Sequence, residues 1–481
     1  MRKFLEKLRN PKEREFFYAL LGGKLIGVAL LFALIVGVPA FFGTKAYAAD
    51  APEAYVNPLN TMWVLITAFL VFFMQAGFMF LEAGFARTRE TINVLLEGIV
   101  DTCLCGILFW AWGFGWMFGS GSGLLGNQYY FLHGIPETYG STGIATLAFF
   151  LFQFAFADCT STITSGAMVG RTGFWGDLLY SFVVSGFIYP ILGHWCWGPD
   201  GWLATLQPLV FRDFAGSTVV HTIGGMLALA GAIALGPRLG RKFKRDGGGP
   251  MPGHDMTIAA VGTVILWFGW YGFNPGSTLS AMDMIGIGRI AANTTLAACA
   301  GGLAAMAFVY PRTKIWDCGM TCNGLLAGLV AITCPCYWVS PGASIIIGLV
   351  AGVLVVLGTD LLEHLRIDDP VGAWPVHGLN GIWGTLSLGL FATGQYGLPT
   401  PTGADTSVTI KGLLYGGGIA QLKAQIIGNG TIAVASLAAG LILMGALKAI
   451  GVLRVSKEGE LQGLDVHEHG STAYPELPSS L

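Results

Sequence analysis

Apolar positions along the chain gather into long runs that are separated by short polar connections. Glycine and proline interrupt many of these runs, which membrane helices tolerate better than soluble ones. Runs of about 20 apolar residues, the length needed to cross the hydrocarbon of a bilayer, begin near residues 59, 94, 142, 175, 215, 256, 287, 320, 342, 375 and 426. The pattern therefore predicts an all-α polytopic membrane protein with eleven membrane-spanning helices.

The amino terminus has the organisation of a signal peptide. Basic residues precede an apolar stretch that ends near Phe42, and "AYAAD" follows, in which Ala46 and Ala48 suit signal peptidase. We therefore expect residues 1–48 to be a signal peptide and the mature chain to begin near Ala49, outside the cytoplasm. A retained first helix is the alternative, because the apolar run is nearly long enough to span a bilayer.

Basic residues occupy every second connection between the apolar runs. They lie at Arg87 and Arg89, Arg171, "PRLGRKFKRD", Arg312 and Lys314, "EHLRIDD" and "LRVSKEGE". Since cytoplasmic loops carry the excess of lysine and arginine, this side is expected to be cytoplasmic. The prediction is a transmembrane domain over residues 49–455 with an outside amino terminus, and a cytoplasmic tail over residues 456–481.

Short motifs recur at two fixed offsets. Glu82 of "QAGFMFLEAG" falls on Asn274 of "FGWYGFNPGS" at an offset of 192 residues, and two glycines coincide there. "VHTIGG" and "VHGLNG" are 156 residues apart, so that His221 falls on His377. The chain is therefore expected to contain two halves of five helices each. The predicted segments are residues 57–236 and 256–396 for the halves and about 426–452 for a last helix.

An odd number of crossings in each half makes the second half run through the membrane in the opposite sense. Inverted repeats of this kind place their functional site near the midplane, between the halves, so we expect His221 and His377 to meet there. A single intramembrane histidine is more often a core residue bonded to a carbonyl. Two at matched positions favour a functional pair, because ionisable groups at lipid depth are costly and usually line a path.

Composition agrees with a membrane protein. The 481 residues are 53% hydrophobic and 11% charged, whereas a soluble domain has about 25% charged residues. A formal net charge of -2 and basic residues confined to loops give no sign of a nucleic-acid partner. Most of the nine cysteines lie in apolar runs and are expected to be free and buried; a disulfide or metal pair is the alternative for Cys318, Cys322, Cys334 and Cys336.

The chain from about residue 57 to 475 resembles a known family, the ammonium transporters of the Amt/Mep/Rh type, and in particular the bacterial Amt type. The motifs that carry the resemblance are "MQAGFMFLEAGFAR", "DFAGSTVVH", "GWYGFNPGS", "TCNGLLAGLVAIT", "DDPVGAWPVHG" and "GLDVHEHGSTAYPE". The resemblance implies a homotrimer in which each subunit has eleven helices and its own narrow pore.

The resemblance also implies a recruitment site for ammonium at the outer mouth. The matching residues are Trp197, Phe156 and Ser277, and Phe152 is expected to line the same vestibule. Two stacked rings, Phe156 and Phe273, match the family's gate. Aromatic faces attract a small cation by about 0.5–2 kcal/mol, and a serine oxygen accepts one ammonium hydrogen, which distinguishes ammonium from potassium.

The twin pore histidines of the family match His221 and His377. Carrying an intact charge through an apolar pore costs several kcal/mol, so passage as ammonia is favoured, with the proton left outside or carried separately along the imidazoles. The family's helix-capping aspartate matches Asp213; structural support of a helix start is favoured for it, and direct cation binding is the alternative.

Two positions differ from the family pattern. Gly170–Arg171 stands where the family often has Glu-Arg, and Gly372 stands where an acidic residue is common. The tail motif implies contact between subunits and a PII-type regulatory partner, with His467 and His469 in the packing. The expected location is the bacterial inner membrane, with a cytoplasmic carboxyl terminus.

Three other functions compete with transport. An electron-transfer enzyme would use the histidines as haem ligands, a sensor would bind ammonium without appreciable flux, and an Rh-type channel would pass neutral gas. We expect a non-enzymatic ammonium transporter with no cofactor and no metal.

Overall fold

The computed structural model describes residues 52–474, and residues 1–51 and 475–481 lie outside the described part of the chain. From Ala54 onward the chain forms one unit. The expected signal peptide over residues 1–48 and the mature start near Ala49 fall outside the described residues.

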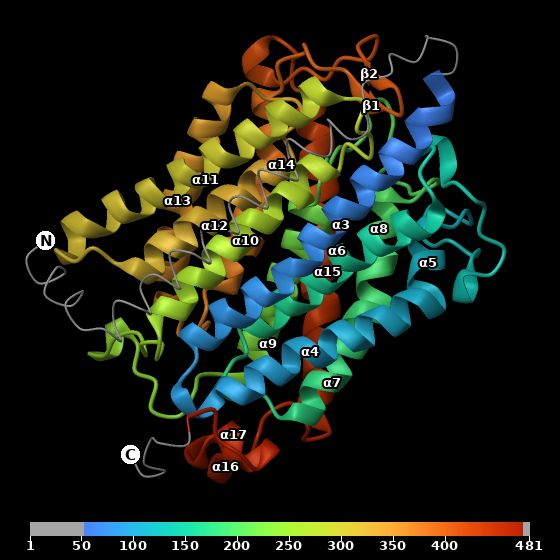
Figure 1. The fold of residues 1–481 in the computed structure, drawn as a ribbon. Coiled ribbons are helices and arrows are strands. Elements are labelled where there is room, and N and C mark those ends of the chain that lie inside the picture. Colours follow the sequence, from blue (N-terminus) through green and yellow to red (C-terminus); the bar gives the residue numbers. More distant parts are fainter. Residues whose placement is uncertain (1–51, 475–481) are drawn as a thin grey trace, which may run out of the picture. The chain divides into compact units, whose positions relative to one another are not determined.

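Helices make up most of the described chain (Figure 1). The α-helices are α3 (Pro52–Phe85), α4 (Thr91–Leu108), α5 (Phe114–Phe118), α6 (Thr146–Gly166), α7 (Phe174–Val183), α8 (Tyr189–Trp197), α9 (Ile223–Leu235), α10 (Met256–Gly276), α11 (Met284–Thr313), α12 (Cys318–Thr333), α13 (Pro341–Leu365), α14 (Asn380–Phe391), α15 (Ala420–Ala449), α16 (Lys457–Gln462) and α17 (Leu464–His469). Four π-helical segments join or extend them: η2 (Phe109–Gly113), η5 (Val184–Ile188), η6 (Ser217–Thr222) and η8 (Trp374–Leu379). The antiparallel strands β1 (Leu398–Thr400) and β2 (Gly403–Asp405) form a hairpin with Thr400 opposite Gly403.

Within residues 52–474, nine helical segments are long and apolar enough to cross a bilayer. They are Tyr55–Phe85, Thr88–Phe118, Thr146–Gly166, Phe174–Trp197, Ser217–Leu235, Met256–Gly276, Met284–Thr313, Pro341–Leu365 and Ala420–Ala449. The other two predicted spans are also helical but shorter: α12 has 16 residues, and η8 continues into α14. The structure therefore supports a multi-pass helical membrane protein, and eleven crossings stay a prediction.

Side-chain caps explain where several of the helices begin. Asp255, Asp283, Asp317 and Ser340 each accept a hydrogen bond from a backbone N–H in the first turn of α10, α11, α12 and α13. Such caps satisfy amide donors that have no partner inside the helix. The helix starts therefore agree with the sequence to within a few residues.

Large apolar side chains remain exposed on the outside of the bundle. On α3 alone, Phe69, Phe72, Phe73 and Phe80 are between 42% and 58% exposed. An exposed apolar surface of this extent is a liability in water, whereas lipid tails cover it without cost. The exposed face of α3 is therefore suited to contact with lipid or with another membrane chain.

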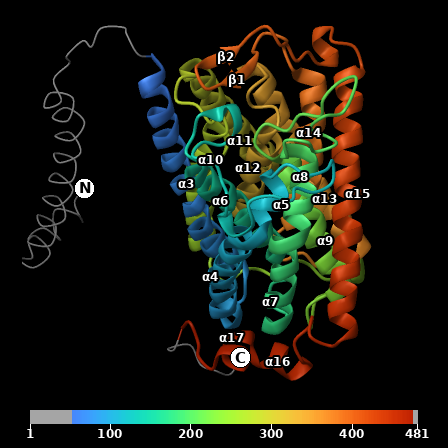
Figure 2. The same ribbon diagram turned by 90° about the vertical axis from the view of Figure 1, so that its right-hand side faces the viewer.

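The tail packs against one end of the bundle, and the β1–β2 hairpin lies at the other end (Figures 1 and 2). We call these the tail end and the hairpin end. The backbone N–H of Asn93 at the start of α4 donates to Asp465 Oδ1 at 2.9 Å, and His469 Nε2 lies 2.9 Å from Asn93 Oδ1. The described tail residues are therefore held by specific contacts.

The two departures from the family pattern have local structural explanations. Gly170 has a φ of +82°, and a Cβ there would lie 2.6 Å from a carboxylate oxygen of Glu90, which fills the space. The neighbouring Arg171 is fully buried, and its guanidinium donates to the main-chain carbonyls of Gly236 and Asp368 at 3.0 and 2.6 Å. Gly372 also has a positive φ, +84°. Both glycines therefore suit backbone turns at the tail end.

A buried ion pair at the tail end leads to a stability prediction. Arg238 donates to both carboxylate oxygens of Asp368 at 2.8 and 3.0 Å, and the two side chains are 3% and 2% exposed. Removing one partner of a buried pair leaves an uncompensated charge and costs about 3–5 kcal/mol. Asp368→Asn should therefore lower the free energy of unfolding by about this amount, measured by denaturation in detergent.

The pH dependence of this effect and a matched variant test the explanation. Burial alone would raise the pKa of Asp368, but the hydrogen bonds and charge of Arg238 hold it well below its usual range. A carboxyl group whose pKa is lowered by folding stabilises the protein at pH values above its pKa in the unfolded chain, about 3.9. This stabilisation is lost as the pH falls through the lower pKa that the group has in the folded protein. The difference between the two proteins should persist down to about pH 4. Asp246→Asn, which breaks an exposed pair with Arg366, should change little.

Candidate functional site

A cavity of about 400 Å³ lies at the hairpin end, where β1 forms part of its wall. All four residues of the predicted recruitment site, Phe152, Phe156, Trp197 and Ser277, line this cavity. The indole N–H of Trp197 donates to the main-chain carbonyl of Asp213 at 2.8 Å, which holds the ring in the cavity wall. Three aromatic rings and one hydroxyl therefore face a common space that is large enough for a small cation.

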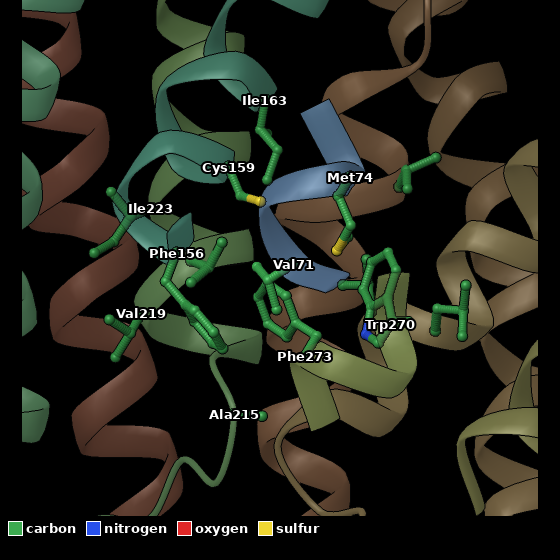
Figure 3. Close-up of a cluster of buried hydrophobic side chains, with 14 of the residues drawn as sticks. Val71, Met74, Phe156, Cys159, Ile163, Ala215, Val219, Ile223, Trp270 and Phe273 are labelled. Atoms are coloured by element: carbon green, nitrogen blue, oxygen red, sulfur yellow. The ribbon is translucent and has the colours of Figure 1, made fainter. Parts of the chain in front are cut away.

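Phe156, which lines this cavity, stacks on a second buried phenyl ring, that of Phe273. The ring centroids of Phe156 and Phe273 are 4.1 Å apart, with 26° between the ring planes, and both side chains are buried. Figure 3 shows these rings side by side, one from α6 and the other from α10. The Ser277 hydroxyl donates to the carbonyl of Phe273 at 2.8 Å, so its oxygen lone pairs are left to accept other hydrogens.

The two predicted histidines are in direct contact. Nδ1 of His221 lies 3.2 Å from Nδ1 of His377, and the side chains are 0% and 5% exposed. The His221 ring packs against both Trp270 and Phe273, with centroid distances of 5.1 and 5.4 Å. The pair therefore lies next to the phenyl rings, deep inside an apolar bundle.

The contact between the imidazoles restricts their protonation. One Nδ1 must carry the proton and the other must accept it. Nε2 of His221 is buried without a hydrogen-bond partner, so it offers either a free N–H or a free lone pair. A distance of 3.2 Å between the Nδ1 atoms leaves no room for a macrocycle between the rings, which argues against the alternative of a haem ligated by this pair.

Two aspartates hold the turns that carry the histidines. Asp213 accepts hydrogen bonds from the backbone N–H groups of Gly216, Thr218 and Val219 at 2.8 to 3.0 Å. Burial raises the pKa of Asp213, and these backbone hydrogen bonds oppose the shift. Asp213 therefore supports the start of η6, as expected.

Asp369 does the same for η8. It accepts from the N–H groups of Gly372, Ala373 and Trp374 at 2.9 to 3.0 Å, and it stands 156 residues after Asp213. Each histidine therefore sits in a π-helical segment whose first backbone N–H groups are held by an aspartate. Such π turns are rare and frequent at functional sites.

Matched glycines allow the two segments to approach. A Cβ on Gly225 would lie 2.1 Å from the backbone nitrogen of Gly378, and a Cβ on Gly381 would lie 2.5 Å from the carbonyl oxygen of Ser217. Any side chain at these positions would push the backbones apart. The glycines that recur beside the histidines are therefore needed for the imidazole contact.

Two cavities follow below the histidines. His377 lines a cavity of about 20 Å³ together with Phe78 and Glu82, which is enough for about one water molecule. A larger cavity of about 510 Å³ at the tail end shares Asn323 and Gly372 with it. We call the cavity lined by Trp197 and Ser277 the outer cavity, the small cavity beside His377 the inner cavity, and the larger one the tail-end cavity. From the hairpin end to the tail end, the order is therefore outer cavity, phenyl pair, histidine pair, inner cavity and tail-end cavity.

Buried ionisable rings are costly at the depth of an apolar bundle, and proteins keep them where something must cross the membrane. With cavities on both sides of the pair, the structure belongs to the class of multi-pass membrane transport proteins. Residues 62–474 match the sequence profile of the Ammonium Transporter Family, and the chain belongs to this family.

Relatives and solved structures agree with this assignment. The chain is 43% identical to the ammonium transporter Amt2 of Archaeoglobus fulgidus over 468 residues, which cover 95% of this chain and 96% of the relative. It is 37% identical to ammonium transporter 1 member 3 of Solanum lycopersicum, over 87% of this chain and 93% of the relative.

Two solved structures share the fold. The Sensor Amt Protein is 38% identical, with a TM-score of 0.77 over 87% of this chain and 100% of its own. Candida albicans Mep2 is 29% identical, with a TM-score of 0.76 over 88% of this chain and 92% of its own. The predicted family is therefore confirmed.

Several residues near the site were not predicted from the sequence. They are Asp369, Trp270, Phe78 and, as a lining residue, Glu82. The offset of 156 residues that pairs the histidines would also have found Asp369. All nine cysteines lie in the described part of the chain and are free, and no group of residues suited to a metal ion occurs among residues 52–474.

Proposed function

We propose that the chain transports ammonium across the membrane and that the substrate passes the histidine pair as ammonia. The observation that carries the proposal is the contact of 3.2 Å between His221 and His377 below a cavity lined by aromatic rings. Membership of the Ammonium Transporter Family supports the substrate.

Recruitment takes place in the outer cavity. The face of Trp197 attracts a small cation, by about 0.5–2 kcal/mol depending on desolvation, and Phe152 and Phe156 add two further faces. The oxygen of Ser277 accepts one ammonium hydrogen, which potassium cannot offer. The cavity therefore prefers ammonium by directional bonding rather than by size.

The cation then loses a proton before it enters the apolar part of the pore. The phenyl rings of Phe156 and Phe273 stack 4.1 Å apart, so they must move aside for passage. An intact charge would cost several kcal/mol beyond them, whereas ammonia can bond to the nitrogen atoms of His221 and His377. The proton stays outside or follows separately along the imidazoles.

The proposed topology follows the sequence. It has a cleaved signal peptide, eleven crossings in two inverted halves, and a cytoplasmic carboxyl-terminal tail in the inner membrane of a bacterium. We also propose a homotrimer and a PII-type partner at the tail end. The cavity there is lined by basic and acidic side chains that pair with one another, such as Arg238 with Asp368 and Lys244 with Asp360.

A sensor is the second candidate function. The similarity to the Sensor Amt Protein at 38% identity favours it, because the same recruitment cavity can bind ammonium without appreciable flux. Uptake of labelled methylammonium by liposomes that contain the purified protein separates the two. Uptake well above that of empty liposomes supports transport, and tight binding without uptake supports a sensor.

Ser277→Leu should weaken recruitment. The change removes the hydroxyl that faces the outer cavity and fills its space with an apolar side chain, at a cost of about 1–2 kcal/mol in binding, or a five- to thirtyfold rise in the half-saturating ammonium concentration. Uptake rates at rising ammonium concentration measure the effect. An unaltered concentration dependence would remove Ser277 from the site.

Trp197→Leu should relax the discrimination against potassium. The variant loses the largest cation-binding face, about 0.5–2 kcal/mol, and leaves only the smaller phenyl faces. Ammonium uptake in the presence of excess potassium measures the change. A selectivity equal to that of the wild-type protein would refute the role of the indole.

A further inference from the structure

Five buried carboxyl groups lie in the part of the bundle formed by α3, α4, α6 and α7. They are Glu82, Glu97, Asp101, Asp158 and Asp177, and each is at most 5% exposed. We call this set the carboxyl cluster. Among the described residues, none of its members forms an ion pair with a basic side chain.

The members lie close to one another. Glu97 and Asp101 lie one turn apart on α4, which packs against α6 and α7; Thr102, the residue after Asp101, donates to Asp158 Oδ2 on α6 at 3.0 Å. Several buried charges of one sign without a counter-charge would cost several kcal/mol each. Most of the cluster must therefore hold protons.

Polar groups without partners face the cluster. Ser181 lies one turn after Asp177 on α7, and Gln75 of α3 contacts α6 through Thr162, which donates to Gln75 Oε1 at 3.0 Å. Yet both oxygens of Asp101, one oxygen of Asp158, the Ser181 hydroxyl and the Gln75 amide nitrogen make no hydrogen bond of normal geometry. Each is nine-tenths buried or more. The Asp101 and Asp158 carboxyls and the Ser181 hydroxyl therefore have free donor or acceptor capacity inside the cluster.

The cluster reaches the pore at one end. Glu82 lines the inner cavity together with His377, so one water molecule there can bridge the two side chains. Ser165 of α6 donates to Glu82 Oε2 at 3.3 Å, which joins Glu82 to the helix that carries Asp158. The inner cavity is therefore a junction between the pore and the cluster.

On the side away from the pore, the carboxyl cluster approaches the tail end of the bundle. Glu97 Oε1 accepts from Asn93 Nδ2 at 2.8 Å, and Asn93 Oδ1 lies 2.9 Å from Nε2 of the half-buried His469. The tail helix α17 therefore lies over the end of α4 at which the cluster approaches the surface.

The proton is the ligand that suits this arrangement. Residues 52–474 contain no group of side chains arranged to hold a metal ion, whereas carboxyl and hydroxyl groups pass a proton without a cavity. We propose that the carboxyl cluster is a side branch of the pore that carries protons from the inner cavity to the tail end. This proposal rests on the proposed function, because the protons are those that ammonium releases.

The transfer is balanced at each step. Ammonium gives one proton to the histidine pair and continues as ammonia. The proton passes from His377, through a water molecule, to the Glu82 carboxylate, which becomes a carboxylic acid. Glu82 returns to its carboxylate when the proton moves to an unprotonated carboxyl of the cluster, and Glu97 gives one proton to a water molecule at the tail end, so that one proton leaves for each one that enters.

The test compares charge movement with substrate movement in reconstituted liposomes. Asp101→Asn keeps the shape of a protonated aspartate but cannot pass a proton. The current driven by an ammonium pulse should fall by about tenfold or more, while labelled methylammonium still equilibrates at zero voltage. Glu82→Gln, at the pore end, should give the same loss of current, and size exclusion checks that both variants fold.

Asp283→Asn is the matched control. Asp283 is also buried, but it caps α11 and accepts from the Tyr337 hydroxyl at 2.7 Å, outside the cluster. Its current should match that of the wild-type protein. A wild-type current in both Asp101→Asn and Glu82→Gln would overturn the proposal, and so would equal losses of current and methylammonium equilibration. Absence of any transport by the wild-type protein would instead contradict the proposed function.

Discussion

Replacing both histidines by alanine, in the variant His221→Ala with His377→Ala, should abolish selective ammonium transport. The two imidazoles are the polar groups in contact at the centre of the pore, and without them ammonia would cross an apolar stretch with no bonding partner. We expect a loss of about 100-fold or more, equivalent to at least about 2.7 kcal/mol in the barrier. Uptake of labelled methylammonium by liposomes measures it.

Folding must be retained for this result to be informative. The rings are buried, so the variant leaves cavities, and size exclusion in detergent checks that the assembly is intact. His194→Ala is a comparison variant: His194 is also buried, but it bonds to the carbonyl of Met117 near the hairpin end. Its transport should stay close to that of the wild-type protein. Unchanged flux in the double variant would defeat the assignment of the pore.

Asp213→Ala should disable transport without touching either imidazole. It leaves the backbone N–H groups of Gly216, Thr218 and Val219 without their acceptor, and an unsatisfied buried donor costs about 1–3 kcal/mol. The π segment that carries His221 should relax and the ring should leave His377. We expect transport to fall by about tenfold or more, together with a lower unfolding temperature.

Asp369→Ala should have the same effect through His377, because Asp369 holds the second π segment in the same way. Asp255→Ala serves as the control, since Asp255 caps α10 through Thr257 and Ile258 away from both histidines. Wild-type transport by Asp213→Ala and Asp369→Ala would show that the caps do not position the imidazoles.

The sequence predicted the helices and the contact between the histidines because each leaves a pattern in the chain. Apolar runs mark membrane segments, and a motif that recurs at a fixed offset marks equivalent positions in two halves. The contact between His221 and His377 agrees with that inference. The resemblance to a family selected Phe152, Trp197 and Ser277 from a background of many apolar and aromatic residues, and these three line one cavity.

The sequence could not predict the π segments or the carboxyl cluster. A π turn adds one residue to a helical turn. The spacing of apolar residues does not reveal the extra residue when the residues on either side of it are also apolar. Glu97 and Asp101 are visible inside an apolar run, but only the packing of α4 against α6 and α7 brings them near Asp158 and Asp177. The proximity of side chains on different helices is a property of the fold.

The two histidines lie in matching π segments but have different neighbours. His221 stacks with Trp270 and Phe273, whereas His377 faces the inner cavity beside Glu82. The pair is therefore polarised, with an aromatic side toward the hairpin end and an acidic side toward the tail end.

The most direct test of selective ammonium passage is the response of liposomes containing the wild-type protein to an ammonium pulse, recorded on a solid-supported membrane at several pH values. The predicted result is a response that saturates with ammonium, is absent with potassium at equal concentration, and disappears in the variant without both histidines. Equal responses to potassium and ammonium, or a response that survives the loss of both imidazoles, would contradict the proposed mechanism.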